Sequence, residues 1–261
     1  MNTQLFFLSA SYILGMIIGS FLNVCIYRIP AGLSIVHPPS RCPHCETLIR
    51  WYQNIPLLSW IVLRGRCASC KAPVSYRYPL IETLSGVLYL LAFLYFGLSW
   101  STLVFWIFFS LLLVITFIDL DHQIIPNVLS LPGIVVGFAS AFFVQPLTWQ
   151  DSAFGIVLGA GLLWSVATGY RLLMGAEGMG MGDVKLLAMI GAFLGWQAVL
   201  PVVFLGSVVG TMIGVPLMLI KGEGGKLAIP FGPFLSLGAF FYIFFWAELF
   251  NWYVSTFFQS I

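Results

Sequence analysis

One uninterrupted apolar stretch, STLVFWIFFSLLLVITFI at residues 101–118, decides which folds are open to this 261-residue chain. A helix that crosses a bilayer needs about 20 mostly apolar residues, and this stretch comes close to that length without a charge. The whole chain has the same character, since 60% of its residues are hydrophobic and only 8% are charged. Soluble domains carry roughly 25% charged residues, so lipid must be the solvent for most of this chain. Disordered, collagen-like and disulfide-rich secreted proteins are excluded by the same composition.

Seven further apolar stretches flank the one at 101–118. Together they predict an all-α polytopic membrane protein with about eight transmembrane helices, forming a single integral membrane domain over residues 1–261. The sixth is short and contains Gly191 and Gly195, so a count of seven is the alternative. The first lacks a basic start and a small-residue cleavage site, so we expect a retained helix. The eight segments are 5–27, 80–97, 101–118, 127–145, 153–173, 185–197, 201–220 and 232–252.

The positive charges predict the orientation of these helices. Seven of the eleven Lys and Arg residues lie between Arg28 and Arg77, and the others are Arg171, Lys185, Lys221 and Lys226. With eight spans all eleven fall on one side of the membrane, and basic residues mark the cytoplasmic side. Both termini are then expected in the periplasm. The segments expected in the cytoplasm are 28–79, 119–126, 174–184 and 221–231, with Glu177 and Glu223 solvated.

Two Cys-x-x-Cys pairs stand in the cytoplasmic loop at 28–79. They are Cys42 with Cys45 and Cys67 with Cys70, and their spacing predicts one structural zinc site of four thiolates. A loop of this length has little core of its own, so a metal would contribute folding free energy. Two disulfides are disfavoured on the reducing side of the membrane, and a thioredoxin-like redox pair would need a strand–helix context.

Other ligand arrangements for this loop stay open. Four unbound thiols are one alternative. His37 or His44 could also replace a cysteine as a ligand, because both lie near the first pair. Cys25, at the end of the first apolar segment, is expected to be a packed thiol.

Three aspartates lie at the predicted cytoplasmic ends of helices, where an ionisable group beside hydrocarbon is costly and indicates function. Asp119 and Asp121 belong to IDLDHQIIPN at 118–127, and Asp183 belongs to GMGMGDVK at 178–185. Two carboxyls from separate helices can share a proton and activate water against an amide carbonyl. Helix capping is the structural alternative. At most one of Asp119 and Asp121 should face Asp183, because residues two apart point to different helix faces.

The glycines before Asp183 predict a close approach of backbone. Gly180 and Gly182 alternate with methionines, and no strand precedes them, so this is not a dinucleotide-binding loop. Alternating glycines would let an extended substrate backbone lie against this turn.

Five motifs occur in order along the chain: GSFLNV at 19–24, the two cysteine pairs, IDLDHQIIPN, GMGD at 180–183 and PFGP at 230–233. Together they resemble bacterial type IV prepilin peptidases from about residue 15 to 240. The resemblance implies an intramembrane aspartyl peptidase with Asp119 and Asp183 as the catalytic pair. Asp121, Gly180, Gly182 and Lys185 would support the pair, and Cys42, Cys45, Cys67 and Cys70 would hold structural zinc.

The resemblance also implies substrates and a second activity. Such a protein resides in the bacterial inner membrane and removes the leader from type IV prepilins and type II secretion pseudopilins, after a glycine on the cytoplasmic side. It then methylates the new N-terminal residue with S-adenosylmethionine, and no nucleic-acid partner is expected. No glycine-rich nucleotide loop marks a methyl-donor site. Asn54 and Arg64 could contact the donor, although solvated loop residues are the simpler interpretation.

Two other functions compete with the peptidase. A proton-coupled transporter would use Asp119 and Asp183 as relay groups, although carriers usually place such groups near the bilayer midplane. A membrane-tethered zinc scaffold would recruit a partner through residues 41–79 and would leave the aspartates unexplained. For the peptidase we expect the carboxyls of Asp119 and Asp183 to lie within roughly 5–8 Å, since resting catalytic geometry is often loose.

Overall fold

The computed structural model describes residues 2–175, 179–221 and 229–257. Within these ranges the fold is all-helical, and β-structure is limited to two isolated bridges. This confirms the predicted fold class. Glu177, Gly178, Glu223 and Lys226, which entered the sequence analysis, lie outside the described residues.

Six helices in the described ranges are long and apolar enough to cross a membrane. Large apolar side chains such as Phe6, Val157 and Phe204 remain exposed on them, as expected of surfaces that face lipid. The protein is therefore a multi-pass membrane protein. The six are α1 (Asn2–Arg28), α3 (Arg77–Phe96), α4 (Trp100–His122), α6 (Trp149–Met174), α8 (Trp196–Lys221) and α9 (Gly232–Phe257).

Two more apolar helices, α5 (Asn127–Ser140) and α7 (Met181–Leu194), have 14 residues each. Helix α5 stops at Ser140 rather than at the predicted 145, because turns follow it toward Pro146. Helix α7 begins four residues before the predicted 185, with Gly180 as its N-cap, and ends before Gly195, whose φ of 82° breaks the helix. Because both helices are shorter than a typical span, the count of eight stays a prediction.

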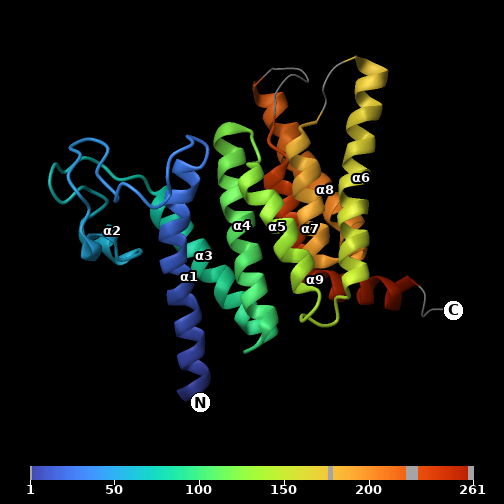
Figure 1. Ribbon diagram of the computed structural model, residues 1–261, viewed down its shortest axis with the longest axis horizontal. Helices are drawn as coiled ribbons and strands as arrows, with labels where there is room; N and C mark the ends of the chain where they lie inside the picture. The colour runs from blue at the N-terminus through green and yellow to red at the C-terminus, as the bar shows by residue number, and fades with distance from the viewer. Residues whose placement is uncertain (1, 176–178, 222–228, 258–261) are drawn as a thin grey trace. The chain divides into compact units, whose positions relative to one another are not determined.

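The chain forms two compact units, residues 1–114 and 115–261, with the boundary inside α4. In the first unit α1 and α3 pack closely (Figure 1). A Cβ at Gly19 would lie only 2.8 Å from the Cα of Glu82, so the two backbones touch through a small residue. The rings of Tyr89 on α3 and Trp106 on α4 stack with centroids 4.9 Å apart.

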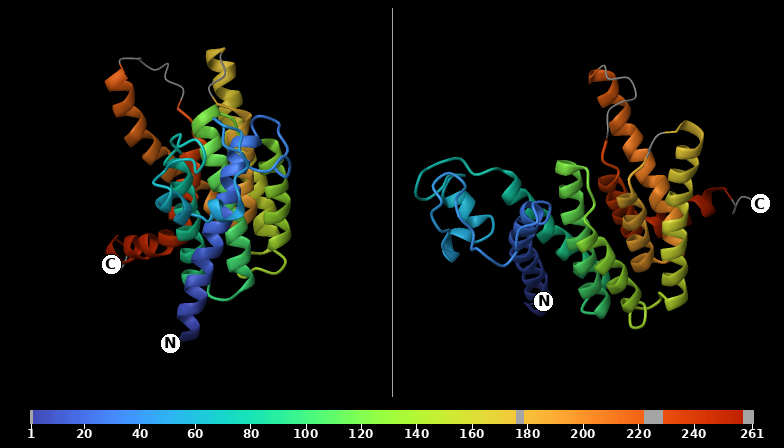
Figure 2. Two further views of the ribbon diagram at one scale, coloured as in Figure 1. Left: turned by 90° about the vertical axis from the view of Figure 1, so that its left-hand side faces the viewer. Right: turned by 45° about the horizontal axis from the view of Figure 1, so that its top comes forward.

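The loop between α1 and α3 belongs to the first unit and lies to one side of these helices (Figure 2). It contains a short 3-10 helix, η1 (Trp51–Asn54), and α2 (Leu58–Val62). Glu82 of α3 anchors it, because the Leu57 N–H donates to Glu82 Oε2 at 2.8 Å. Asn23 of α1 donates to the Tyr78 carbonyl at 3.2 Å and fixes the beginning of α3.

In the second unit α7 forms the core, with residues 184 and 186–193 buried. Helix α6 crosses it where Gly155 meets the backbone of Gly191, leaving no room for a side chain at either position. The Ser152 hydroxyl adds a hydrogen bond of 2.7 Å to the Ala192 carbonyl. Small residues thus let the backbones of α6 and α7 approach one another near the C-terminal end of α7.

Candidate active site and metal centre

Asp119 lies near the C-terminal end of α4 and is only 4% exposed. Its Oδ2 accepts a hydrogen bond of 3.0 Å from the backbone N–H of Gly232, the first residue of α9. The first N–H groups of a helix have no partner within the helix and favour an anion. A Cβ at position 232 would lie 2.7 Å from Oδ2, so only glycine fits there without a shift.

Asp183 lies in the first turn of α7, where it is half-buried. Its N–H donates to the Gly180 carbonyl at 3.2 Å, which shapes the entry into the helix. A Cβ at Gly182 would come 2.9 Å from the Cβ of Ile125, and one at Gly232 would come 3.4 Å from Ile125 Cδ1. Ile125 therefore lies against both the start of α7 and the start of α9.

The carboxyl of Asp183 interacts with that of Asp119. Asp183 is outside the six membrane-length helices, and its burial raises its pKa to about 7, with the negative charge of Asp119 as the second cause. Carboxyls that interact in this way gain and lose protons as a pair. The structure therefore couples two residues that the sequence placed on distant segments.

The four residues predicted to support the pair differ in their surroundings. Asp121 is exposed, unlike Asp119 two residues before it. Lys185 Nζ donates to Asn127 Oδ1 at 2.7 Å and so ties the start of α7 to the start of α5. Gly182 packs closely, since a Cβ there would lie 2.9 Å from Ile125 Cβ, whereas a Cβ at Gly180 would make only ordinary contacts, the nearest at 3.8 Å to Asp183 Oδ2.

The hydrogen bond from the Gly232 N–H to Asp119 was not predicted by the sequence analysis. Residues 230–233 entered that analysis only as a motif of the resembled family. Gly232 and Asp119 are 113 positions apart, so no local pattern connects them. The available signal was a glycine between two prolines just before an apolar segment, which indicates a constrained backbone.

The four loop cysteines form one cluster, with all Sγ atoms within 4.8 Å of one another. Cys42 and Cys70 are 3.8 Å apart, and Cys45 and Cys67 are 4.0 Å apart. Tetrahedral zinc with Zn–S bonds of about 2.3 Å needs sulfur atoms about 3.8 Å from one another. The cluster is thus compatible with zinc. Neither His37 nor His44 belongs to it, and Cys25 is buried in α1.

Both cysteine pairs use the same turn. The Cys42 N–H donates to the Thr47 carbonyl at 3.0 Å, and the Cys67 N–H donates to the Ala72 carbonyl at 2.8 Å. The residue after each second cysteine has a positive φ, 54° at Glu46 and 61° at Lys71. Two equivalent turns facing one another are an arrangement that can present four thiolates to one ion.

The electrostatics favour the thiolate at Cys45 and Cys67, whereas the pKa of Cys70 is raised to about 11, because the hydrogen bond from the Ala72 N–H is outweighed by desolvation and the neighbouring thiols. Hydrogen bonds from the hydroxyl and then the backbone of Thr47 lower the pKa of Cys45 to about 6. The N–H groups of Cys70 and Ser69 lower the pKa of Cys67. Because a metal binds the thiolate form, lowered pKa values assist metal binding at neutral pH.

Comparison with known proteins identifies the family. Residues 13–96 match the bacterial peptidase A24 N-terminal domain, and residues 106–215 match the type IV leader peptidase family. A prepilin leader peptidase/N-methyltransferase of Stutzerimonas stutzeri is 40% identical over 260 residues, covering 90% of each chain. The chain belongs to the type IV leader peptidase family.

Other family members are similar to this chain in sequence over comparable lengths. The prepilin leader peptidase/N-methyltransferase of Aeromonas hydrophila is 36% identical and covers 96% of this chain and 95% of its own. That of Pseudomonas aeruginosa is 37% identical and covers 88% of each. No solved structure gave a match. The leader peptidase match contains Asp119 and Asp183, and the N-terminal match contains all four clustered cysteines. The family resemblance predicted from the motifs is thereby confirmed.

Proposed function

We propose that the chain is a prepilin leader peptidase and N-methyltransferase whose proteolytic site is the Asp119–Asp183 pair. It cleaves the leader from type IV prepilins and type II secretion pseudopilins after a glycine. It then methylates the new N-terminal residue with S-adenosylmethionine. The relatives described above carry this double name, and the family match covers both aspartates.

The observation that carries the proteolytic assignment is the electrostatic coupling of a buried carboxyl to a half-buried one. Asp119 also accepts a backbone N–H, a contact that holds its carboxylate in one orientation. Asp121 is exposed at the same helix end, which supports Asp119 as the partner of Asp183.

The pair can perform amide hydrolysis without a metal in the reaction. With one proton shared, the ionised carboxylate takes a proton from water as the water oxygen attacks the scissile carbonyl. The protonated carboxyl then gives its proton to the departing nitrogen. A Cβ at Gly180 would meet nothing closer than 3.8 Å, which leaves room for an extended substrate backbone beside Asp183.

Zinc, location and orientation complete the proposal. Cys42, Cys45, Cys67 and Cys70 hold a structural zinc ion, because four thiolates leave no position open for water. The chain lies in the bacterial inner membrane as one integral domain, with the loop at 28–79 in the cytoplasm and both termini in the periplasm. A basic leader then meets an acidic pair, although Coulomb attraction reaches only about 8 Å at physiological salt.

The competing functions explain less of the molecule. A transporter would give Asp119 and Asp183 a relay role, but the family match and the names of the relatives favour hydrolysis. A zinc scaffold would use only the first unit and would give no role to the carboxyl pair of the second.

Cleavage of a purified prepilin with a Gly–Phe junction tests the proposal. The unaltered protein should shorten the prepilin, whereas Asp119→Asn and Asp183→Asn should each lower the rate by at least about 1000-fold, because neither variant can complete the proton cycle. Asp121→Asn discriminates between the neighbouring carboxyls and should keep most of the activity. Normal cleavage by both Asp119→Asn and Asp183→Asn would reject the pair.

A further inference from the structure

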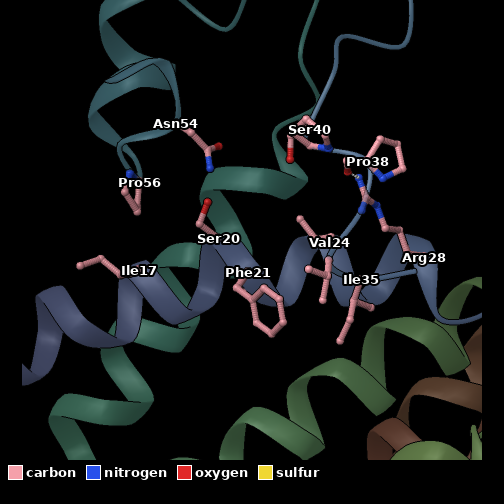
Figure 3. A pocket seen from close by; sticks show the side chains of 12 residues that line it. Ile17, Ser20, Phe21, Val24, Arg28, Ile35, Pro38, Ser40, Asn54 and Pro56 are labelled. Atoms are coloured by element: carbon pink, nitrogen blue, oxygen red, sulfur yellow. Dashed lines mark hydrogen bonds between the residues drawn. The ribbon is translucent and has the colours of Figure 1, made fainter. Parts of the chain in front are cut away.

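The first unit contains a cavity of about 310 Å³ that the cleavage chemistry does not use. One wall comes from α1, through Ile17, Ser20, Phe21 and Val24, and the other from the loop around 35–40 and 54–56 (Figure 3). Small-molecule sites begin at about 300 Å³ and combine apolar walls with a few placed polar groups. This cavity has that composition.

The motif GSFLNV at 19–24 forms this wall and divides its residues between two faces. Gly19, Leu22 and Asn23 are buried, with Gly19 and Asn23 in contact with α3. Ser20 and Phe21 instead line the cavity, and 47% of the Phe21 side chain is exposed. The accessible ring of Phe21 can stack against the flat face of a nucleobase.

The carboxyl of Glu82 on α3 is buried next to the α1 wall of the cavity. Glu82 is 6% exposed, accepts the Leu57 N–H at 2.8 Å and has the hydroxyl of Ser20 as a further partner. When the Ser20 hydroxyl donates to Glu82, its lone pairs remain free to accept. The oxygens of Ser20 and Glu82 carry partial negative charge, which favours a cation at this side of the cavity.

Hydrogen-bond donors come from both walls, Asn54 from the loop and Arg28 from the end of α1. Figure 3 shows the side chains of Asn54 and Ser20 pointing toward one another across the cavity. Arg28 donates to the carbonyls of Ser34 at 2.9 Å and Pro38 at 2.7 Å, which holds the loop around 35–40 against the end of α1. A guanidinium has five N–H groups, so Arg28 can still bind a carboxylate.

From this arrangement we infer that the cavity of the first unit binds S-adenosylmethionine as the methyl donor of the methylation step. The donor carries an adenine ring, a sulfonium cation and a carboxylate, which correspond to Phe21, to Ser20 backed by Glu82, and to Arg28. The inference rests on the methyltransferase part of the proposed function and assigns that part a site.

The reaction at such a site balances without a further reactant. The neutral N-terminal amine of the cleaved pilin attacks the methyl carbon, a carbon–nitrogen bond forms and the carbon–sulfur bond breaks. Sulfur leaves as a neutral thioether with the electron pair of the broken bond. The methylated amine then releases one proton to water.

Equilibrium dialysis of the purified full-length protein against radiolabelled S-adenosylmethionine tests the inference. Ser20→Ala and Asn54→Ala should each weaken binding by about tenfold, the equivalent of one lost hydrogen bond at 1.4 kcal/mol. Ser59→Ala is the matched control, since this serine lies in the same loop, binds the Tyr52 carbonyl and does not line the cavity. Zinc content and leader cleavage, which do not use the cavity, should be unchanged in all three.

Ultraviolet crosslinking of the labelled donor gives a second readout. The label should appear on peptides from residues 17–28 or 35–56 of the unaltered protein. Two results would reject the cavity as the donor site without rejecting the methyltransferase activity. One is crosslinked label found only on residues after 115. The other is donor binding within about twofold of normal in both Ser20→Ala and Asn54→Ala. An unaltered protein that cleaves but neither binds nor uses the donor would overturn the methyltransferase activity and the site with it.

Discussion

At the scale of single residues, two side-chain carboxyls and one backbone amide define the proposed peptidase. The sequence was sufficient to single out Asp119, Asp121 and Asp183, because charges beside long apolar segments are conspicuous. It could not choose between Asp119 and Asp121 from the residues alone, since that choice depends on which one is buried. The resemblance to the family selected Asp119, and the burial in the structure supports that selection.

Replacing Gly232 should damage cleavage although the residue has no side chain. In Gly232→Ala the new methyl would lie 2.7 Å from Asp119 Oδ2, so the carboxyl must move. A displacement of this kind can cost about 100-fold in rate, and we expect a loss of that order in kcat/KM.

Gly161→Ala is the control for this substitution, since nothing lies within 4 Å of a Cβ at that position in α6. Kinetics of prepilin cleavage by the two purified variants provide the measurement. Equal activity of Gly232→Ala and Gly161→Ala would mean that the amide contact to Asp119 has no part in catalysis.

The pH dependence of cleavage should reflect the coupled carboxyls. The pKa of Asp183 is raised to about 7, so its proton is present below that pH and is lost as the pH rises through it. Because hydrolysis needs one proton on the pair, kcat/KM should fall on the alkaline side with a midpoint near pH 7. Methylation of a pilin that is already cleaved serves as the control. A cleavage rate that stays constant from about pH 6 to pH 9 would contradict a shared proton.

At the scale of elements, the sequence predicted the helices well and their ends less well. All eight apolar segments became helices, but α5 and α7 are shorter than the other six. Hydropathy counts apolar residues and does not register the turn after Ser140 or the break at Gly195. The cysteine pairs were more predictable, because their spacing favours one four-thiolate site, and the four Sγ atoms do lie together.

Replacing one cysteine in either pair should release zinc. Cys42→Ser and Cys67→Ser each remove one of four ligands, so zinc content should fall from one per chain to well below half. Atomic absorption on purified variants would measure it. Cys25→Ser should retain full zinc, since Cys25 is buried in α1 outside the cluster. Unaltered zinc in both cluster variants, or zinc-free unaltered protein, would reject the metal site.

At the scale of the whole molecule, the distribution of positive charge predicts the orientation of the chain. All eleven Lys and Arg residues fall on one predicted side, a pattern that composition alone would not produce. The division into two units was not predicted, because the apolar segments look alike along the sequence whereas the units differ in which helices contact one another.

Fusions of alkaline phosphatase, which is active only outside the cytoplasm, would test this orientation. A fusion after residue 99 should be active, because the connection at 98–100 has no basic residue and is expected in the periplasm. A fusion after residue 50 should be inactive, since it lies in the basic loop. Immunoblots of both fusions control for expression, and the reverse pattern would invert the topology.

The hydrogen bond from Gly232 to Asp119 also bears on how the enzyme is made. The amide lies 113 positions after the carboxyl it holds, so a ribosome adding about 5–20 residues per second needs on the order of ten seconds to supply it. In the proposed mechanism, a chain without α9 lacks the amide that orients Asp119. Full proteolytic activity is therefore expected only after this helix has been inserted.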